Sequence, residues 1–259
     1  MNRIEAVIFD WAGTTVDHGS LAPVRALTAL FARHGVDLSD ADARRDMGLF
    51  KKDHIRRILS LPHVELSPDE RVVEELFNEF GSLQTAILES HAQMIDGAAD
   101  VAHRLRKRGM RIGSTTGYTR PMLDILLARA SDQGYAPELS LCPDDVGGGR
   151  PRPWMCLRIA LEFRLGSTAA VVKVGDTVSD IEEGLNAGMW TVGVSRTGNE
   201  VGLSAEEFAG LTEAERIRRT EHACAMLRTA GAHEVVESVA LLEPAIERLD
   251  RRLAAGERP

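Results

Sequence analysis

Short apolar runs alternate with helical patterns through most of the chain after residue 97. The apolar runs lie at residues 110–115, 138–142, 169–175 and 190–195, helical spacing fills residues 98–108, 120–133, 153–164 and 178–187, and a last strand is expected at 233–239. Such alternation predicts a parallel sheet with helices on both faces. An earlier buried-strand pattern ends at Phe9 and has no strand pattern close to it in the chain, so we expect it to join the same sheet.

The residues between the first strand and residue 97 have a helical pattern throughout. Residues 21–34 carry apolar side chains at helical spacing, Ser39 is a candidate N-cap for a short helix, and residues 67–70 open a long helical region. The sequence therefore predicts an α/β protein, a doubly wound parallel sheet with a helical cap inserted after its first strand. We expect the core to comprise residues 1–18 and 97–259 and the cap residues 19–96.

Composition narrows the class of partner. The 259 residues include 39 acids and 31 bases, which give a net charge of −8, and no run of Lys and Arg forms a basic patch. A nucleic-acid or membrane-surface binder would need such a patch, so a small molecule is the expected partner. Three scattered cysteines do not suggest a disulfide framework, and we find no membrane-spanning stretch or room for a signal peptide before the first strand. These features predict a cytoplasmic protein.

Chemically useful side chains follow the predicted strands at their carboxyl ends. Asp10 ends the first strand, the hydroxyl-rich segment 114–117 ends the second, Arg150 lies on the glycine-rich loop after the third, and Asp176 and Asp180 follow the fourth. Because ligands bind beyond the carboxyl ends of parallel strands, we expect these groups to share one site. Together they suit Mg²⁺-assisted chemistry on a phosphoryl group, and without clustered His and Cys a zinc site is disfavoured.

Each of these residues also has a non-catalytic interpretation. Asp10 could cap a turn, the 114–117 segment could cap a helix, Arg150 could be solvated, and Asp176 with Asp180 could be a cap and a first-turn acid. Taken singly, none of them establishes a site. Their occurrence at one sheet edge favours the catalytic interpretation.

A second candidate group lies in the predicted cap. If the stretch from Arg45 to His54 is helical, Met47, Lys51 and His54 share one face, while Lys52 points toward solvent. A lysine among apolar groups can lose enough of its pKa to attack a carbonyl, and His54 could then move protons. The alternative is that Lys51 is a solvated surface lysine and His54 a satisfied polar residue.

The motifs at the sheet edge resemble those of the haloacid dehalogenase (HAD) superfamily. The resemblance rests on Phe9-Asp10, Ser114-Thr115-Thr116-Gly117, Arg150 and Gly175-Asp176 with Asp180, in this order along the chain. It implies that Asp10 is a nucleophile that becomes an aspartyl phosphate. It also implies that Thr116 donates to a phosphoryl oxygen, that Arg150 stabilises charge, and that Asp176 and Asp180 anchor the metal.

One position departs from the superfamily pattern. Its phosphatases carry a second aspartate two residues after the nucleophile, and this chain has Ala12 there. A phosphate-ester hydrolase needs a general acid at that position, because an alkoxide is a poor leaving group. The missing acid favours a catalytic role for Lys51 over the solvated alternative, because an amine could activate the leaving group in another way.

Ala12 and Lys51 together resemble the pattern of one HAD family, the phosphonoacetaldehyde hydrolases (phosphonatases). The segments that carry the likeness are Val7–Thr15, Met47–Leu49 with Lys51 and His54, Gly113–Arg120, Gly149–Pro151 with Pro153–Met155, and Lys173–Asp180. The likeness implies that Lys51 forms an imine with phosphonoacetaldehyde and that Asp10 attacks phosphorus. The products would be acetaldehyde and phosphate.

The same resemblance assigns the remaining expectations. Mg²⁺ would be held by Asp10, the backbone carbonyl of Ala12 and Asp176, with Asp180 in support. His54 would shuttle protons, and the substrate pocket would include Met47, Gly48, Gly117 and Tyr118. The family pattern also implies a homodimer.

Three other functions compete with this prediction. A phosphatase or phosphomutase acting on a phosphate ester is opposed by Ala12, and a haloacid dehalogenase has no need of Asp176 and Asp180 as a metal site. A non-catalytic HAD-like binding or scaffold protein would have no need for the complete set of Asp10, Arg150 and Asp176.

Overall fold

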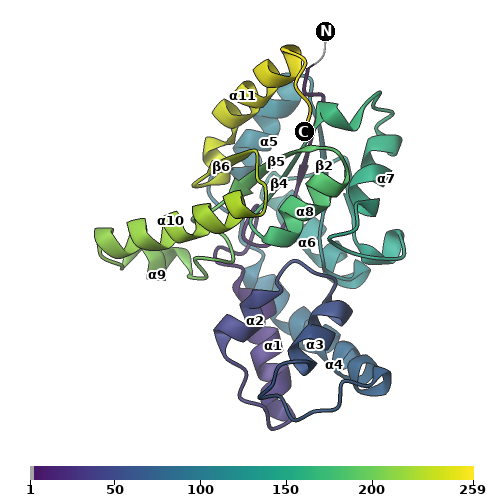
Figure 1. Ribbon diagram of the computed structural model, residues 1–259, viewed down its shortest axis with the longest axis vertical. Coiled ribbons are helices and arrows are strands. Elements are labelled where there is room, and N and C mark those ends of the chain that lie inside the picture. The colour runs from purple at the N-terminus through teal and green to yellow at the C-terminus, as the bar shows by residue number, and fades with distance from the viewer. Residues whose placement is uncertain (1–2) are drawn as a thin grey trace.

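A computed structural model describes residues 3–259, and its centre is a parallel sheet (Figure 1). Within those residues the sheet has six strands in the order β3-β2-β1-β4-β5-β6, and each neighbouring pair is parallel. The strands are β1 (Ala6–Phe9), β2 (Arg111–Thr115), β3 (Leu139–Leu141), β4 (Val171–Gly175), β5 (Trp190–Val194) and β6 (Glu234–Val236). The predicted parallel sheet is therefore confirmed, with β1 between β2 and β4.

Helices cover both faces of this sheet. One layer contains α5 (Ala98–Lys107), α6 (Arg120–Asp132) and α11 (Leu242–Ala254), and the other contains α7 (Trp154–Glu162), α8 (Val178–Asn186) and α10 (Glu213–Thr229). Strand β1 contributes apolar side chains to both faces of the sheet. Val7 and Phe9 pack in the apolar core on one face, and Ala6 and Ile8 pack in the core on the other. The short helix α9 (Ala205–Ala209) and α10 project to one side of the body (Figure 1). Over residues 3–259, none of the helices has the length and apolar character needed to cross a membrane.

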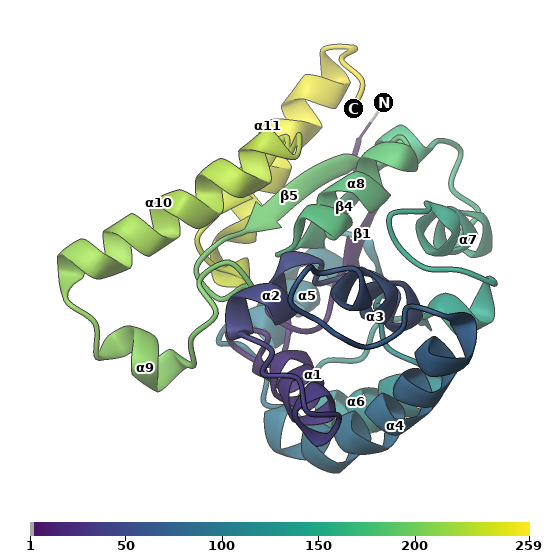
Figure 2. The same ribbon diagram turned by 60° about the horizontal axis from the view of Figure 1, so that its bottom comes forward.

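Four helices between β1 and α5 form the cap, which lies at the end of the core where the strands point (Figures 1 and 2). They are α1 (Leu21–Arg33), α2 (Asp40–Arg45), α3 (Lys51–Leu59) and α4 (Glu70–Leu88). Helix α1 packs on α4 through buried apolar side chains that include Leu27, Phe31 and Phe80. The predicted N-cap at Ser39 is confirmed, since its side chain accepts a hydrogen bond from the Asp42 N–H.

The stretch from Arg45 to His54 is not one helix, so the condition that would place Met47, Lys51 and His54 on one helix face is not met. Helix α2 ends at Arg45 and α3 begins at Lys51, with a turn between them in which Gly48 has φ +88°. A residue with a side chain is strained at that φ, and glycine lets the chain reverse there. Met47 thus precedes the helix that carries Lys51 and His54. It still reaches Lys51 across the turn, with 3.3 Å between Lys51 Nζ and Met47 Sδ.

The two segments of chain that connect the core to the cap lie side by side. Val16 and Met94 form an antiparallel bridge, and the Asp17 N–H donates to the Gln93 carbonyl at 3.2 Å. Asp17 also stabilises the start of helix α1, because its carboxylate accepts hydrogen bonds from the N–H groups of Leu21 and Ala22. The two connecting segments therefore form one hydrogen-bonded crossing between core and cap, close to the loop that follows β1.

Candidate active site at the junction of core and cap

The loops at the carboxyl ends of β1, β3 and β4 bring oppositely charged groups together. Asp10 follows β1, and its Oδ1 lies 2.7 Å from Nη2 of the buried Arg150. Carboxylate oxygens of Asp10, Asp176 and Asp180 all lie within 4.8 Å of one another. The structure thus brings together the four charged residues that the sequence places after three separate strands.

Arg150 is held from several sides. Its Nη1 lies 2.9 Å from Asp180 Oδ1, its Nε lies 2.8 Å from Glu183 Oε2, and its Nη2 donates to the Thr115 carbonyl at 2.8 Å. Lys173 lies behind this group, with its Nζ 2.7 Å from Asp180 Oδ1. A guanidinium with this many fixed partners cannot swing away, so Arg150 presents a stationary positive charge beside Asp10.

Sequence reasoning missed Lys173 and Glu183 as parts of this site. Both side chains are fully buried and lie 3.4 Å apart. The signal was present in the sequence, because Lys173 interrupts the otherwise apolar strand β4. A buried cation in a central strand needs a buried anion near it, and Glu183 lies on α8, the next helix in the chain.

The acids differ in how fully their charge is offset. Asp180 has two cations beside it and Asp10 has Arg150, while Asp176 forms no ion pair with any of the described residues. Asp180 has Arg150 and Lys173 on one oxygen and Thr177 on the other, and these partners lower its pKa although burial opposes them. Burial and the charge of Asp180 raise the pKa of Asp10 to about 6. Burial and the charge of Asp10 raise that of Asp176 well above its ordinary value. Two buried carboxylates with raised pKa fit a divalent cation, which prefers oxygen ligands.

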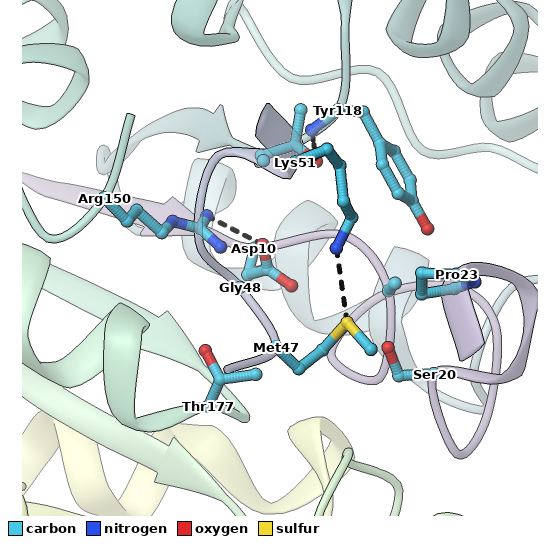
Figure 3. Close-up of a pocket in the computed structure, with 12 residues that line it drawn as sticks. Asp10, Ser20, Pro23, Met47, Gly48, Lys51, Tyr118, Arg150 and Thr177 are labelled. Carbon is cyan, nitrogen blue, oxygen red and sulfur yellow. Dashed lines mark hydrogen bonds and ion pairs between the residues drawn. The ribbon is translucent and has the colours of Figure 1, made fainter. Parts of the chain in front are cut away.

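A small chamber lies between these acids and the cap (Figure 3). Every residue expected in the substrate pocket lines the chamber, and so do Ser20, Pro23 and Thr177, which sequence reasoning missed. The lining residues are Asp10, Ala12, Ser20, Pro23, Met47, Gly48, Lys51, Thr116, Gly117, Tyr118, Arg150 and Thr177.

Lys51 extends from the start of α3 into this chamber (Figure 3). Its side chain is 2% exposed, and burial lowers its pKa to about 7 although Asp10 opposes the shift. At pH 7 about half of such amines are neutral, compared with roughly one in several thousand for an ordinary lysine. Lys52 points outward as predicted and forms ion pairs with Glu70 and Glu74.

His54 lies beside Lys51 on α3 and is fully buried, but it is outside the set of residues that line the chamber. Burial and the charge of Lys51 hold its pKa well below the usual range, so the ring is neutral at pH 7. Among the described residues neither ring nitrogen has a hydrogen-bond partner. In this structure His54 therefore lies next to Lys51 but is not part of the chamber wall.

Two glycines allow the cap to lie directly against the core. A Cβ on Gly48 would be 2.4 Å from Oγ1 of Thr177, and a Cβ on Gly117 would be 2.9 Å from the Leu49 carbonyl oxygen. Both distances are shorter than a side chain permits, so larger residues would force the two layers apart. Thr116 lies beside Gly117. Its hydroxyl accepts from the Tyr118 N–H at 3.2 Å, and its own proton is left for an acceptor in the chamber.

Comparison with known proteins identifies the class. Residues 4–188 match the family model for haloacid dehalogenase-like hydrolases, and the chain belongs to this class of enzymes. A β-phosphoglucomutase from Clostridium difficile has the same fold, with a TM-score of 0.70 at 17% identity.

More similar proteins identify the family within the class. Phosphonoacetaldehyde hydrolases from Bacillus thuringiensis (strain Al Hakam) and Bacillus anthracis are 43% identical to this chain over 258 residues, which cover 96% of it and 98% of each relative. A phosphonoacetaldehyde hydrolase-like protein from Oleispira antarctica is also 43% identical, and its crystal structure superposes with a TM-score of 0.97 over 99% of this chain and 96% of that one. The chain belongs to the phosphonoacetaldehyde hydrolase family.

We expect Lys51 to react with cyanate at a lower pH than ordinary lysines. Only the neutral amine reacts, so carbamylation should increase with pH through a midpoint near the pKa of about 7 that burial gives Lys51. Lys52 is the matched control, because its contacts with Glu74 and Glu70 raise its pKa. Peptide mass spectrometry over a pH series measures both rates. Equal midpoints for the two lysines would contradict the assignment.

Proposed function

We propose that this enzyme hydrolyses the C–P bond of phosphonoacetaldehyde through a lysine imine and an aspartyl phosphate. The observation that carries the proposal is the presence of Lys51, with its lowered pKa, in the same small chamber as Asp10 and Arg150. Ala12 lines that chamber where a phosphatase would need an acid. The names of the 43%-identical relatives support the same substrate.

The first step in this proposal joins Lys51 to the substrate. The neutral amine attacks the aldehyde carbon, and loss of water from the resulting carbinolamine leaves a protonated imine. We assign proton transfer in these steps to His54, acting through Lys51 or a water because it lies outside the chamber lining. Met47 and Tyr118 shape the wall around the amine.

The second step breaks the C–P bond. Asp10 attacks phosphorus, the Asp10 oxygen–phosphorus bond forms, and the electron pair of the C–P bond moves into the imine to give an enamine. Arg150 and the Thr116 hydroxyl bind the oxygens of the transferring group. A divalent cation, Mg²⁺ in our proposal, would be held by Asp10, the carbonyl of Ala12 and Asp176, with Asp180 behind them, and would reduce the repulsion between the two anions.

Two hydrolyses complete the cycle. Water cleaves the aspartyl phosphate and releases phosphate. Protonation of the enamine at carbon regenerates an imine, which water converts to acetaldehyde and free Lys51. The net reaction consumes one water for each C–P bond broken. No general acid at position 12 is used, because the enamine leaves without a proton on oxygen.

We also retain as proposals the division into a core of residues 1–18 and 97–259 and a cap of residues 19–96, a cytoplasmic location, and a homodimer. The domain division is supported by the paired crossing at Val16 and Met94. The location rests on composition, and the homodimer on family resemblance. We expect no nucleic-acid partner because the net charge is −8.

Borohydride reduction in the presence of phosphonoacetaldehyde tests the imine. We expect a reduced adduct on Lys51, located by peptide mass spectrometry. Lys51→Arg should lose both the adduct and at least ~10³-fold of the activity, because guanidinium does not form the imine. Lys52→Arg is the matched control and should keep both. An adduct on Lys52 alone, or cleavage without any adduct, would rule out the proposed role of Lys51. Equally fast hydrolysis of sugar phosphates would favour a phosphatase instead.

Asp10→Asn separates the two halves of the reaction. We expect phosphate release to stop, because an amide is a poor nucleophile, while Lys51 still forms the imine. Borohydride should then trap an adduct that retains the phosphonate group, whereas the wild-type enzyme also gives the adduct without it. The mass of the Lys51 peptide distinguishes them. If the variant formed no adduct in a folded protein, Asp10 would be needed before C–P cleavage and the division of labour would be wrong.

A further inference from the structure

The loop after β5 contacts three functional parts of the molecule. The Thr197 hydroxyl donates to the Gly13 carbonyl, next to the nucleophile loop, at 2.7 Å. The Gly19 N–H, in the crossing to the cap, donates to the Thr197 carbonyl at 2.8 Å. The Asn199 N–H donates to Asp176 Oδ2 at 2.8 Å. This loop, residues 195–203, therefore helps to fix an acid of the metal site.

The cap reaches the same loop through one side chain, Arg44 at the end of α2. Its Nη1 donates to the Gly19 carbonyl at 2.9 Å and to the carbonyl and side-chain oxygens of Asn199 at 3.3 Å, and its Nη2 donates to the Gly202 carbonyl at 3.1 Å. In return, Asn199 Nδ2 donates to the Arg44 carbonyl at 3.1 Å. Side chain and backbone of one cap residue are thus bonded to one core loop.

Two glycines let the loop lie close to both Arg44 and Asp176. Gly202 has φ +65°, and a Cβ there would be 2.7 Å from the Arg44 guanidinium carbon. A Cβ on Gly198 would be 2.5 Å from Asp176 Cβ. Glycines therefore let the loop approach Arg44 on one side and Asp176 on the other. The guanidinium donates from two separate nitrogens in a fixed plane, a spacing of donors that the single nitrogen of an ammonium does not reproduce.

Arg44 is half-buried and has no carboxylate partner in hydrogen-bond contact among the described residues. Burial lowers its pKa, and the charges of Asp40 and Asp17 oppose this. These bonds form only while the cap lies on the core, because Arg44 is on the cap and its acceptors on Asn199 and Gly202 are on the core loop. The bonds would be exchanged for water if the cap opened.

We propose that Arg44 is a positioning residue that couples cap closure, through Asn199, to the placement of Asp176 for metal binding. The proposal rests on the proposed function in assigning a metal to Asp176. Closing the cap fixes the loop and so strengthens cation binding, and cation binding favours closure by the same factor. Lys51 enters the chamber only when the cap lies on the core, so imine formation and metal placement become linked.

The test uses the full-length chain in four variants and one control. Asn199→Ala removes the side-chain bonds to Arg44 but keeps the backbone N–H that Asp176 accepts. Arg44→Ala, Arg44→Lys and the Arg44→Ala/Asn199→Ala double variant complete the series. Arg45→Ala is the matched control, because the neighbouring guanidinium contacts Asp42 within the cap. Thermal unfolding identifies folded variants, and Arg44→Lys keeps the charge if Arg44→Ala does not fold.

Calorimetric titration of Mg²⁺ into each free protein gives the main result. We expect affinity to fall about five- to tenfold in Arg44→Ala and in Asn199→Ala, by less in Arg44→Lys, and not at all in Arg45→Ala. The double variant should be no weaker than Arg44→Ala, because both changes break one connection. Excess Mg²⁺ should restore part of kcat/KM in the single variants, which a general loss of structure would not permit.

Two results would overturn the proposal. One is an unchanged Mg²⁺ affinity in both single variants, and the other is strictly additive losses in the double variant. These outcomes are independent of the proposed reaction. If the wild-type enzyme did not cleave phosphonoacetaldehyde, the proposed function would fail, while the titrations would still decide whether Arg44 acts through Asn199.

Discussion

The structure depends on the burial of several acids at one sheet edge. Asp10, Asp176, Asp180 and Glu183 lie in a space from which water is largely excluded, and their mutual repulsion must be offset locally. Arg150 and Lys173 neutralise Asp180 and Glu183. Asp10 shares Arg150 with these two acids, and Asp176 forms no ion pair with any of the described residues. Burial and repulsion between the acids therefore still raise the pKa of Asp10 and of Asp176, which favours a cation beside the nucleophile. The fixed position of Arg150 follows from the same balance.

The cap adds a second electrostatic element. Lys51 is carried on a separate layer, and its lowered pKa is a consequence of burial against the core. An open cap would return Lys51 to water and restore an ordinary lysine, so the reactive amine exists only in the closed arrangement. Gly48 and Gly117 make that arrangement possible by removing the side chains that would separate the layers.

The sheet and the charged residues at its edge could be predicted from the sequence, because they depend on local patterns. The apolar runs fixed the strands, and the residues directly after them fall at one edge in any parallel sheet. The spacing of Met47, Lys51 and His54 also fits one helix face, and local spacing cannot show that the chain instead reverses at Gly48 with a positive φ. Ser20, Pro23 and Thr177 were missed because they reach the chamber through the docking of cap on core. Arg44 and Asn199 are 155 residues apart, and no local pattern connects them.

The two layers divide the chemistry according to what each can hold. The core carries groups that need fixed charge, and a general acid at the Ala12 position would serve only a leaving group that departs as an alkoxide. A carbon leaving group instead needs a site for its electron pair, and a protonated imine provides one. Such an imine requires an amine that is neutral at physiological pH, which a site filled with carboxylates would oppose by raising the pKa of any lysine within it. In the mechanism we propose, burial on the cap beside Met47 and Tyr118 lowers the pKa of Lys51 by more than Asp10, in the same chamber, raises it. In that mechanism the absence of an acid at position 12 and the presence of an amine on the cap both serve cleavage of a C–P bond.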